Sequence, residues 1–347
     1  MSDIDIRTSG RAGRITLRRP QALNALTYRM ILDIETALDA WAGDDGVAML
    51  VLDAEGDKAF CAGGDIAEMY ATGTAGDYSY GRKFWRDEYR VNAKMFEFPK
   101  PVATFLQGFT MGGGVGIGCH GSHRIVGDTS RIAMPECGIG LIPDVGGSLI
   151  LARAPGHLGE YLGTTAHRMG PGDAIHAGFA DFFLPEDRWP DLIAELQETG
   201  DWRAVERAAV PAPPSPLAAL AAEIDAHFAG KTLSDILDGL EAADTEFAAT
   251  ALKALSRNSP LSMACTVELV HRVRARPEIR VALDHEYRFT SRSMEDGDFL
   301  EGIRAAIIDK DRSPRWRHAS PGEVSAQDVA DMMRPLAQEA LQWEKTP

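Results

Sequence analysis

The chain has 347 residues, of which 45% are hydrophobic, so it can bury the core of one large domain or of two ordinary ones. Its formal net charge of −15 argues against a nucleic-acid or anionic-membrane partner, because both require a basic surface. No apolar stretch approaches the length of a membrane span.

The cysteines and the N-terminus indicate the compartment. The four cysteines, Cys61, Cys119, Cys137 and Cys265, show no CxxC spacing, which argues against a disulfide framework or a zinc site. The first ten residues have neither an apolar signal core nor an Arg-rich transit pattern. We therefore expect a soluble, cytoplasmic protein without a leader.

The N-terminal half alternates short strands with helical segments, which is typical of a parallel α/β core. Strands are predicted at 15–17, 48–52, 101–106, 124–126 and 131–133. Between the first two, Asn24 or Thr27 caps a helix with apolar residues at helical spacing. The run at 48–52 is apolar throughout, as in a strand buried on both faces. A later helix is expected to end at Ala177, before Gly178.

The second half has a different composition. A proline-rich connection at 210–216 cannot form a helix. Beyond it, helical periodicity predicts helices over 217–228, 233–240, 247–255 and 260–270. These patterns divide the chain into a core at 1–205, a linker at 206–216 and a helical C-terminal region at 217–347.

The block 298–311 indicates that this C-terminal region packs on the core. It is dense in charge, yet it carries five apolar residues at helical spacing: Phe299, Leu300, Ile303, Ile307 and Ile308. One face of this segment must therefore be buried.

Two glycine turns follow predicted strands. FCAGGDI at 60–66 follows the run at 48–52, and MGGGVGIG at 111–118 follows the strand at 101–106. A glycine turn exposes backbone N–H groups, and a helix after it directs its positive end to the same place. Two such turns suit a developing oxyanion, although tight helix packing would also explain them.

Two carboxylates, Glu136 and Asp144, lie in the apolar run MPECGIGLIPD. Burial in such a run raises the pKa of a carboxyl group, which suits nucleophilic or acid–base chemistry. Each acid would alternatively cap the first turn of a helix. His120 and His123 fit neither the HExxH spacing nor a nucleophile elbow, so we predict no metal site.

These motifs, with RP at 19–20, NAL at 24–26 and MPECGIGLIPDVGG at 134–147, resemble the enoyl-CoA hydratase/isomerase (crotonase) superfamily over residues 15–183. The resemblance implies an α/β fold built as a spiral of ββα units, to which the α-helical C-terminal region is added. Residues 1–205 would then form an acyl-CoA-binding catalytic core.

Within the superfamily, the chain is most similar to hydrolases of 3-hydroxyisobutyryl-CoA. The similarity rests on Glu136 with Asp144 eight residues later, on Glu88 in FWRDEY and on the block 298–311. It implies hydrolysis of the thioester of a short 3-hydroxyacyl-CoA, a reaction of valine catabolism.

The resemblance also assigns roles to individual residues. The N–H groups of Gly64 and Gly113 would form the oxyanion hole for the thioester oxygen. Glu136 and Asp144 would be catalytic, with Glu136 either attacking the carbonyl or activating water. The substrate-binding positions are Glu88, Gly113, Glu136 and Asp144. The CoA-binding positions are Ala62, Gly64, Asp65 and Ile66.

The alternative activity is that of a hydratase or isomerase acting on a short-chain enoyl-CoA. Enoyl-CoA hydratases carry a further glutamate two residues after the glycine triplet, and that position is Gly116 here. A third hypothesis is a silent acyl-CoA-binding subunit, against which Glu136 and the glycine turns argue.

The expected partner is an acyl-CoA substrate. Because CoA is part of that substrate, we expect no separate cofactor and no metal. Arg18, Arg19 and Lys58 are candidates for the CoA phosphates, although surface Arg and Lys are common. Members of the superfamily often form trimers, and the long C-terminal region could cover the surface that they use, so a homo-oligomer is left open.

Overall fold

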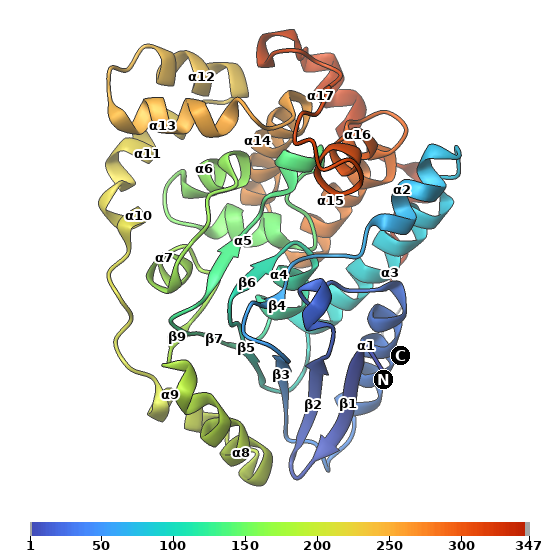
Figure 1. The fold of residues 1–347 in the computed structure, drawn as a ribbon, viewed down its shortest axis with the longest axis vertical. Coiled ribbons are helices and arrows are strands. Elements are labelled where there is room, and N and C mark those ends of the chain that lie inside the picture. Colours follow the sequence, from blue (N-terminus) through green and yellow to red (C-terminus); the bar gives the residue numbers. More distant parts are fainter. Residues whose placement is uncertain (1, 344–347) are drawn as a thin grey trace. The chain divides into compact units, whose positions relative to one another are not determined.

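The computed structural model describes residues 2–343, which form two compact units of interleaved segments (Figure 1). Unit 1 comprises Met1–Asp65, Arg90–Ala133 and Arg168–Ala219. Unit 2 comprises Ile66–Tyr89, Met134–His167 and Leu220–Pro347. The last four residues of the predicted helical region, 344–347, lie outside the described residues.

This division differs from the predicted boundaries at 205 and 217. Two segments of the predicted core, Ile66–Tyr89 and Met134–His167, cluster with the helices that follow Leu220. Contacts between residues so distant in sequence leave no local signal, so composition alone could not have grouped these segments.

Unit 1 contains two sheets, with strand orders β1-β2-β3-β5-β7-β9 and β4-β6-β8. The strands are β1 (Ile4–Ser9), β2 (Ala12–Leu17), β3 (Met49–Ala54), β4 (Ala59–Cys61), β5 (Val102–Phe105), β6 (Phe109–Met111), β7 (His123–Val126), β8 (Arg131–Ala133) and β9 (Phe182–Phe183). The β1–β2 pair is antiparallel, and the other pairs are parallel. The predicted α/β class is therefore confirmed.

The chain repeats one step through these sheets. In β3–β4, β5–β6 and β7–β8, the first strand enters the large sheet and the second enters the small one. This alternation is the spiral of ββα units that the sequence resemblance implied. The edge strand β1 was not predicted, because IDIRTS ends in polar residues and pairs on one side only.

The helices of unit 1 are α1 (Tyr28–Ala42), α4 (Gly113–Gly118), α7 (Pro171–His176), α8 (Trp189–Thr199), α9 (Arg203–Ala208) and α10 (Pro216–Ala219). Thr27 caps α1, since its side chain accepts a hydrogen bond from Met30 N. Asn24 does not cap this helix. Its side chain accepts from Arg19 N at 2.8 Å and donates to Ala59 O at 2.9 Å, which ties two loops together.

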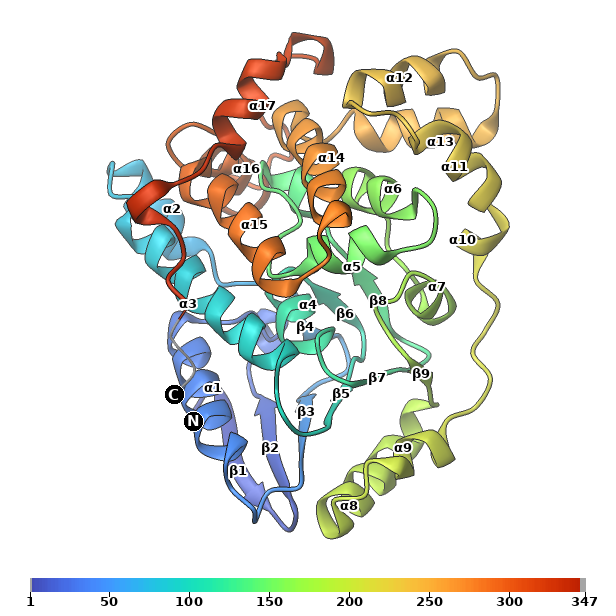
Figure 2. The same cartoon turned by 180° about the vertical axis from the view of Figure 1, so that it is seen from behind.

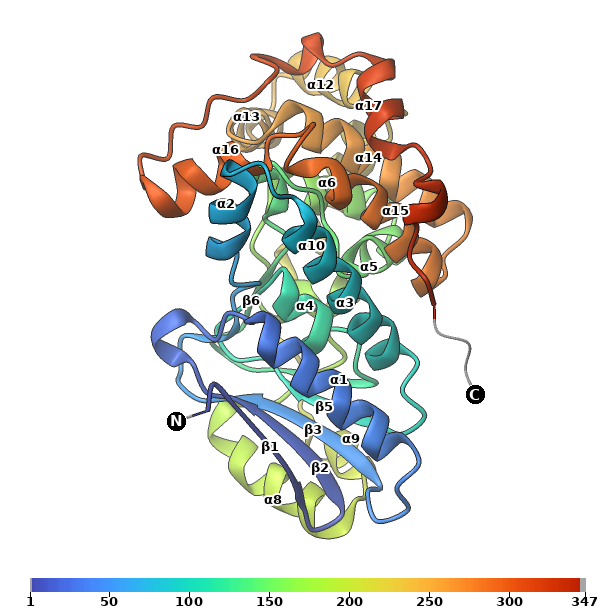
Figure 3. The same cartoon turned by 90° about the vertical axis from the view of Figure 1, so that its right-hand side faces the viewer.

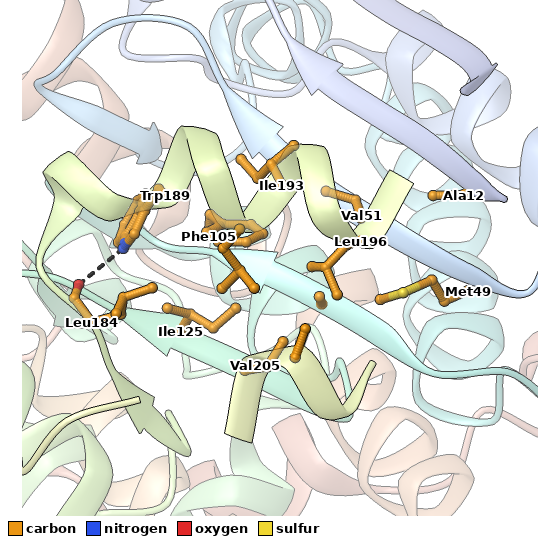
Figure 4. Packing of buried hydrophobic residues seen from close by; sticks show 13 residues of the cluster. Ala12, Met49, Val51, Phe105, Ile125, Leu184, Trp189, Ile193, Leu196 and Val205 are labelled. Carbon is orange, nitrogen blue, oxygen red and sulfur yellow. Dashed lines mark hydrogen bonds between the residues drawn. The ribbon is translucent and has the colours of Figure 1, made fainter. Parts of the chain in front are cut away.

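The core of unit 1 lies between the large sheet and α8, and α1 lies on the opposite side of the strands β1 to β3 (Figure 3). Side chains of the strands meet α8 and α9 in a buried cluster (Figure 4). The Trp189 ring packs edge-on against Phe105 at 5.3 Å, and its Nε1 donates to Leu184 O. Trp189 thus buries a large apolar surface without leaving its polar atom unpaired.

Unit 2 is helical and has no strand within residues 2–343. Its elements are α2 (Ala67–Thr74), most of α3 (Ser79–Phe96), η2 (Glu136–Ile139), α5 (Gly147–Arg153), α6 (Leu158–Thr165), α11 (Ala221–Phe228), α12 (Leu233–Glu241), α13 (Glu246–Leu255), α14 (Pro260–Ala275), α15 (Ile279–Ser293), α16 (Phe299–Ile303), the π-helix η4 (Arg304–Ile308) and α17 (Ala326–Met333). Figure 2 shows α14 and α15 side by side. α14 packs on α5 and α6, and α16 packs on α2 and η2.

The prediction for the block 298–311 is correct in its first part only. Phe299 and Ile303 are buried, but Ile307 and Ile308 are 39% and 45% exposed. The helix α16 gives way to η4, whose wider turns change the angular spacing of side chains, so the helical register predicted from the sequence fails there.

The proline-rich connection is non-helical, as predicted, over residues 211–215, which form neither helix nor strand. It is shorter than the predicted linker, because α9 continues to Ala208 and α10 begins at Pro216.

Among residues 2–343, no helix has the combined length and apolar character that crossing a bilayer requires.

A buried ion pair joins α6 to α14. The Glu160 side chain is fully buried and accepts from Arg274 Nη2 at 2.8 Å and lies 3.1 Å from His271 Nε2. Burial alone would raise the pKa of Glu160, but the hydrogen bonds from Arg274 and His271 lower it to about 2. The folded state therefore favours ionised Glu160, and this stabilisation is present above pH 4.5 and is lost as the pH falls toward 2.

We expect Glu160→Gln to lower the free energy of unfolding by on the order of 3 kcal/mol at pH 7, because Arg274 loses its buried partner. Urea unfolding should show the gap between wild type and variant narrowing below pH 4.5. Glu278→Gln, at an exposed ion pair with Arg276, is the control and should leave stability nearly unchanged. A difference in the free energy of unfolding that does not change with pH would contradict the lowered pKa of Glu160.

Candidate functional site

The first glycine turn follows β4 and is held by backbone hydrogen bonds to the loop before α1. Ala62 N donates to Leu23 O, and Asp65 N donates to Leu26 O at 2.8 Å. These bonds use the N–H groups of the two residues that flank the Gly63-Gly64 pair. Within residues 2–343, the Gly64 N–H donates to no protein acceptor.

The second glycine turn follows β6 and begins α4. Gly112 has φ 49° and ψ −123°, a conformation open only to glycine. Gly113 is the first residue of α4, so its N–H has no partner within the helix. A Cβ atom on Gly114 would lie 2.1 Å from Cys61 O, so the two turns are in backbone contact. The two glycine motifs of the sequence are thus adjacent within unit 1.

Unit 2 contains the predicted acids. Glu88 lies on α3, Glu136 is the first residue of η2, and Asp144 lies in the loop before α5; each is 4% exposed. Tyr89 Oη donates to Asp144 Oδ2 at 2.7 Å. Glu136 Oε2 is buried and has no hydrogen-bond partner among the described residues.

Burial raises the pKa of all three acids. The pKa values of Glu88 and Glu136 lie well above the ordinary glutamate value, because of desolvation first and then the nearby charge of Asp144. Burial also raises the pKa of Asp144 to about 7, while the hydrogen bond from Tyr89 opposes the shift. The predicted rise in pKa is confirmed, and Asp144 is the group through which the acids are coupled.

A fourth acid was not predicted. Glu286 on α15 is fully buried, and burial raises its pKa to about 8. Its carboxyl oxygens accept hydrogen bonds from Gly146 N at 2.8 Å and from Ser148 N at 3.2 Å. A signal existed, because Glu286 lies in the helical stripe of Ala282, Leu283 and Phe289, where a charged residue is unexpected.

The predicted site residues therefore fall into two sets. Gly64 and Gly113 lie in unit 1, with the CoA-binding positions Ala62 and Asp65. Glu88, Glu136 and Asp144 lie together in unit 2, and Ile66 begins that unit as the N-cap of α2. Neither Glu136 nor Asp144 caps a helix by a side-chain hydrogen bond, so the capping alternative is not supported.

Two of the basic residues proposed to bind the CoA phosphates form ion pairs with acidic side chains. Arg19 pairs with Asp65 at 3.1 Å, and Arg18 pairs with Glu55 at 2.7 Å. Arg19 therefore contributes to the geometry of the first glycine turn by holding Asp65.

His120 and His123 serve packing. The His123 ring stacks on Phe182 at 5.9 Å, and its Nδ1 lies 2.9 Å from Ser122 Oγ. The His120 ring is edge-on to Phe96. Over the described part of the chain, no cluster of three or more His, Cys, Asp or Glu is arranged to hold a metal ion.

Comparison with known proteins identifies the family. The family model for enoyl-CoA hydratase/isomerase matches residues 12–333. The chain belongs to the enoyl-CoA hydratase/isomerase family. This confirms the crotonase-like fold and the membership that the two glycine motifs indicated.

Several members of the enoyl-CoA hydratase/isomerase family are similar over nearly the whole chain. The 3-hydroxyisobutyryl-CoA hydrolase of Gallus gallus is 34% identical, over 98% of this chain and 91% of that protein. The one from Xenopus laevis is 36% identical, over 91% of this chain and 85% of that protein. The names of both relatives include the word mitochondrial.

Two solved structures share the fold. An enoyl-CoA hydratase from Rhodobacter sphaeroides 2.4.1 is 58% identical, with a TM-score of 0.94, covering 99% of this chain and 100% of its own. A carnitinyl-CoA dehydratase from Mycobacterium thermoresistibile is 38% identical, with a TM-score of 0.95, covering 100% of both chains.

Proposed function

We propose that the protein hydrolyses the thioester of a short 3-hydroxyacyl-CoA, with 3-hydroxyisobutyryl-CoA as the first substrate to test. The observation that carries the proposal is the buried pair of Glu136 and Asp144, in which Asp144 is held by Tyr89. The names of the curated relatives support the same reaction. With this substrate, the reaction would belong to valine catabolism.

Gly64 and Gly113 are proposed to donate their N–H groups to the thioester oxygen. Each is free of a protein acceptor within residues 2–343, and an oxyanion donor of this kind contributes about 2.7–4 kcal/mol to transition-state stabilisation. Glu88 is the proposed contact for the acyl group. Ala62, Gly64, Asp65 and Ile66 are the proposed contacts for CoA.

Glu136 is proposed to act in one of two ways. As a nucleophile, its carboxylate attacks the carbonyl carbon, CoA leaves as thiolate, and water hydrolyses the resulting anhydride. As a base, it takes a proton from the water that attacks the carbonyl carbon directly. Both routes need ionised Glu136, and its unpartnered Oε2 is available for either. Asp144 would orient the water or the substrate hydroxyl.

The alternative is hydration of an enoyl-CoA, which the 58% identity to the enoyl-CoA hydratase from Rhodobacter sphaeroides 2.4.1 favours. The residue at position 116 argues against it. Gly116 lies inside α4 and is buried, so the second glutamate of the family's hydratases has no counterpart there. The carboxylate pair of this chain comes instead from Glu136 and Asp144.

The test is a panel of acyl-CoA substrates assayed for free thiol and for loss of the enoyl absorbance. We expect thiol release to be fastest with 3-hydroxyisobutyryl-CoA and 3-hydroxypropionyl-CoA, in buffer containing EDTA and no nucleotide. Faster hydration of crotonyl-CoA than cleavage of either thioester would favour the alternative. Loss of activity in EDTA with recovery on added zinc would contradict the prediction that no metal is needed.

Three further points stay predictions. They are the absence of a cofactor other than substrate CoA, a cytoplasmic location, and the oligomeric state, for which a homo-oligomer is one possibility. Size-exclusion chromatography with light scattering would measure the last.

A further inference from the structure

The helix α15 contacts the surroundings of Asp144 at two positions one helical turn apart. Glu286 binds the loop that follows Asp144, and Thr290 lies 3.3 Å from Tyr89 Oη, the hydroxyl that donates to Asp144. Residues four apart share a face of a helix, so one face of α15 supports both sides of this carboxylate. All of these residues belong to unit 2.

The loop after Asp144 has a strained backbone. Val145 has φ 55°, in the left-handed region that a β-branched residue rarely adopts, and Gly146 follows with φ 79°. Such a conformation persists only where the surroundings enforce it. Glu286 accepts from the N–H groups of Gly146 and Ser148, and it also accepts from the Ser148 hydroxyl. These bonds fix the residues that directly follow Val145.

The second support acts through Tyr89. The phenol has a single hydrogen and lies closer to Asp144, at 2.7 Å, than to the Thr290 hydroxyl, at 3.3 Å. The bond with Thr290 lowers the pKa of Tyr89, as expected when the Thr290 hydroxyl donates to the phenolic oxygen. Tyr89 and Thr290 are both fully buried, so neither can replace this bond with one to water. Thr290 therefore holds the Tyr89 hydroxyl in the direction of Asp144.

We propose that α15 is a positioning element for Asp144, in which Glu286 fixes the following loop and Thr290 fixes the Tyr89 hydroxyl. This proposal rests on the proposed catalytic role of Asp144. Glu286 and Thr290 are positioning residues, since they reach the reaction only through Asp144 and Tyr89. The arrangement keeps the carboxylate in one orientation while the chemistry takes place beside it.

Because charged groups surround Glu286, the positioning role can be tested through the pH dependence of activity. A purely structural role would not shift this pH dependence. The groups that face it are Asp144 and Glu136 from the 134–147 segment and Tyr89 from α3, and Glu88 lies near Asp144. The charge of Glu286 raises the pKa of Glu136, so removing this charge should let Glu136 ionise at lower pH. Removing the Tyr89 hydroxyl takes away a bond that favours ionised Asp144, so Asp144 should ionise at higher pH.

The first experiment compares Glu286→Gln and Tyr89→Phe with wild type in steady-state assays across pH. We expect each to lower kcat by at least about tenfold with a smaller change in KM, as for misplacement of a reacting group. The acid limb of kcat/KM should move to lower pH in Glu286→Gln and to higher pH in Tyr89→Phe. Glu160→Gln removes a buried acid whose side chain bonds Arg274 and His271 of α14 and not this loop, so it should move neither kcat nor the limb. Acid limbs that coincide with wild type in both variants would overturn the proposal.

The second experiment is a pair of double-mutant cycles, which stay informative if Glu286→Gln folds poorly. Thr290→Val should lower kcat severalfold in wild type and have no further effect in Tyr89→Phe. Glu286→Gln should have no further effect on kcat in Asp144→Asn. Thr164→Val, which removes another buried hydroxyl of unit 2, is the control. Additive effects in both cycles would overturn the proposal.

These measurements separate the positioning proposal from the proposed function. If wild type hydrates enoyl-CoA and does not release thiol, the proposed function fails. The variants are then compared with wild type in the hydration assay. Opposite shifts of the acid limb there would still support the positioning role, and coincident limbs would contradict it.

Discussion

Glu136→Gln is expected to lower kcat by at least about 100-fold, the low end of a general acid–base contribution, while the substrate still binds. The amide keeps the size of the side chain but loses the charge that either catalytic route requires. The variant should be no less stable than wild type, because Glu136 Oε2 makes no hydrogen bond that would be lost and burial disfavours its charge.

Three measurements check this expectation. Thiol release gives kcat, calorimetry gives the affinity for the unreacted acyl-CoA, and urea unfolding gives the stability. Glu278→Gln at the exposed ion pair is the matched substitution and should leave all three unchanged. Turnover near wild type in Glu136→Gln would mean that another carboxylate performs the chemistry. A single turnover of wild type in H₂¹⁸O, followed by mass spectrometry of the protein and product, would distinguish nucleophile from base.

Gly114→Ala is expected to lower kcat/KM by about 100-fold or more, the loss associated with one oxyanion donor. The new Cβ would meet Cys61 O at 2.1 Å and Cys61 C at 2.9 Å, so β4 and α4 would have to move apart. Because these are backbone atoms, no side-chain rotation relieves the clash. The movement would displace the N–H group of Gly113 relative to that of Gly64.

The control for this substitution is Gly43→Ala, also in unit 1. Gly43 has φ −101°, and no atom lies within 4 Å of its added Cβ, so activity and stability should stay near wild type. The activity of Gly114→Ala should be measured alongside its circular dichroism and unfolding midpoint. A folded Gly114→Ala protein with wild-type kcat/KM would contradict the proposed oxyanion role of the turns.

The fold could be predicted where a local pattern decides the structure. Thr27 at an N-cap, the apolar strand before the first glycine turn and Gly178 after a helix are all where the sequence indicated. The helix α15 was missed because many of its residues are charged, although Glu286 and Arg292 are buried. Its burial depends on partners more than a hundred residues away, which periodicity does not reveal.

Two acids of the candidate site, Glu136 and Asp144, could also be predicted from a local pattern. Glu136 and Asp144 stand out because a short apolar run surrounds them in sequence. Tyr89, Glu286 and Thr290 are ordinary helical residues whose roles come from hydrogen bonds across the fold. The sequence therefore indicates the groups proposed to react, while the groups that hold them in place require the structure.

The interleaving of the two units has a consequence for synthesis on the ribosome. Unit 1 has all of its residues once Ala219 has emerged, but Ile66–Tyr89 must wait for the helices that follow Leu220. At about 5–20 residues per second, α2 emerges roughly 10–40 s before α15. Apolar side chains such as Met69 and Phe84, buried in the finished protein, are exposed during this interval. A nascent chain of this protein is therefore a natural client for a chaperone that binds apolar helices, and a stalled or truncated chain would remain one.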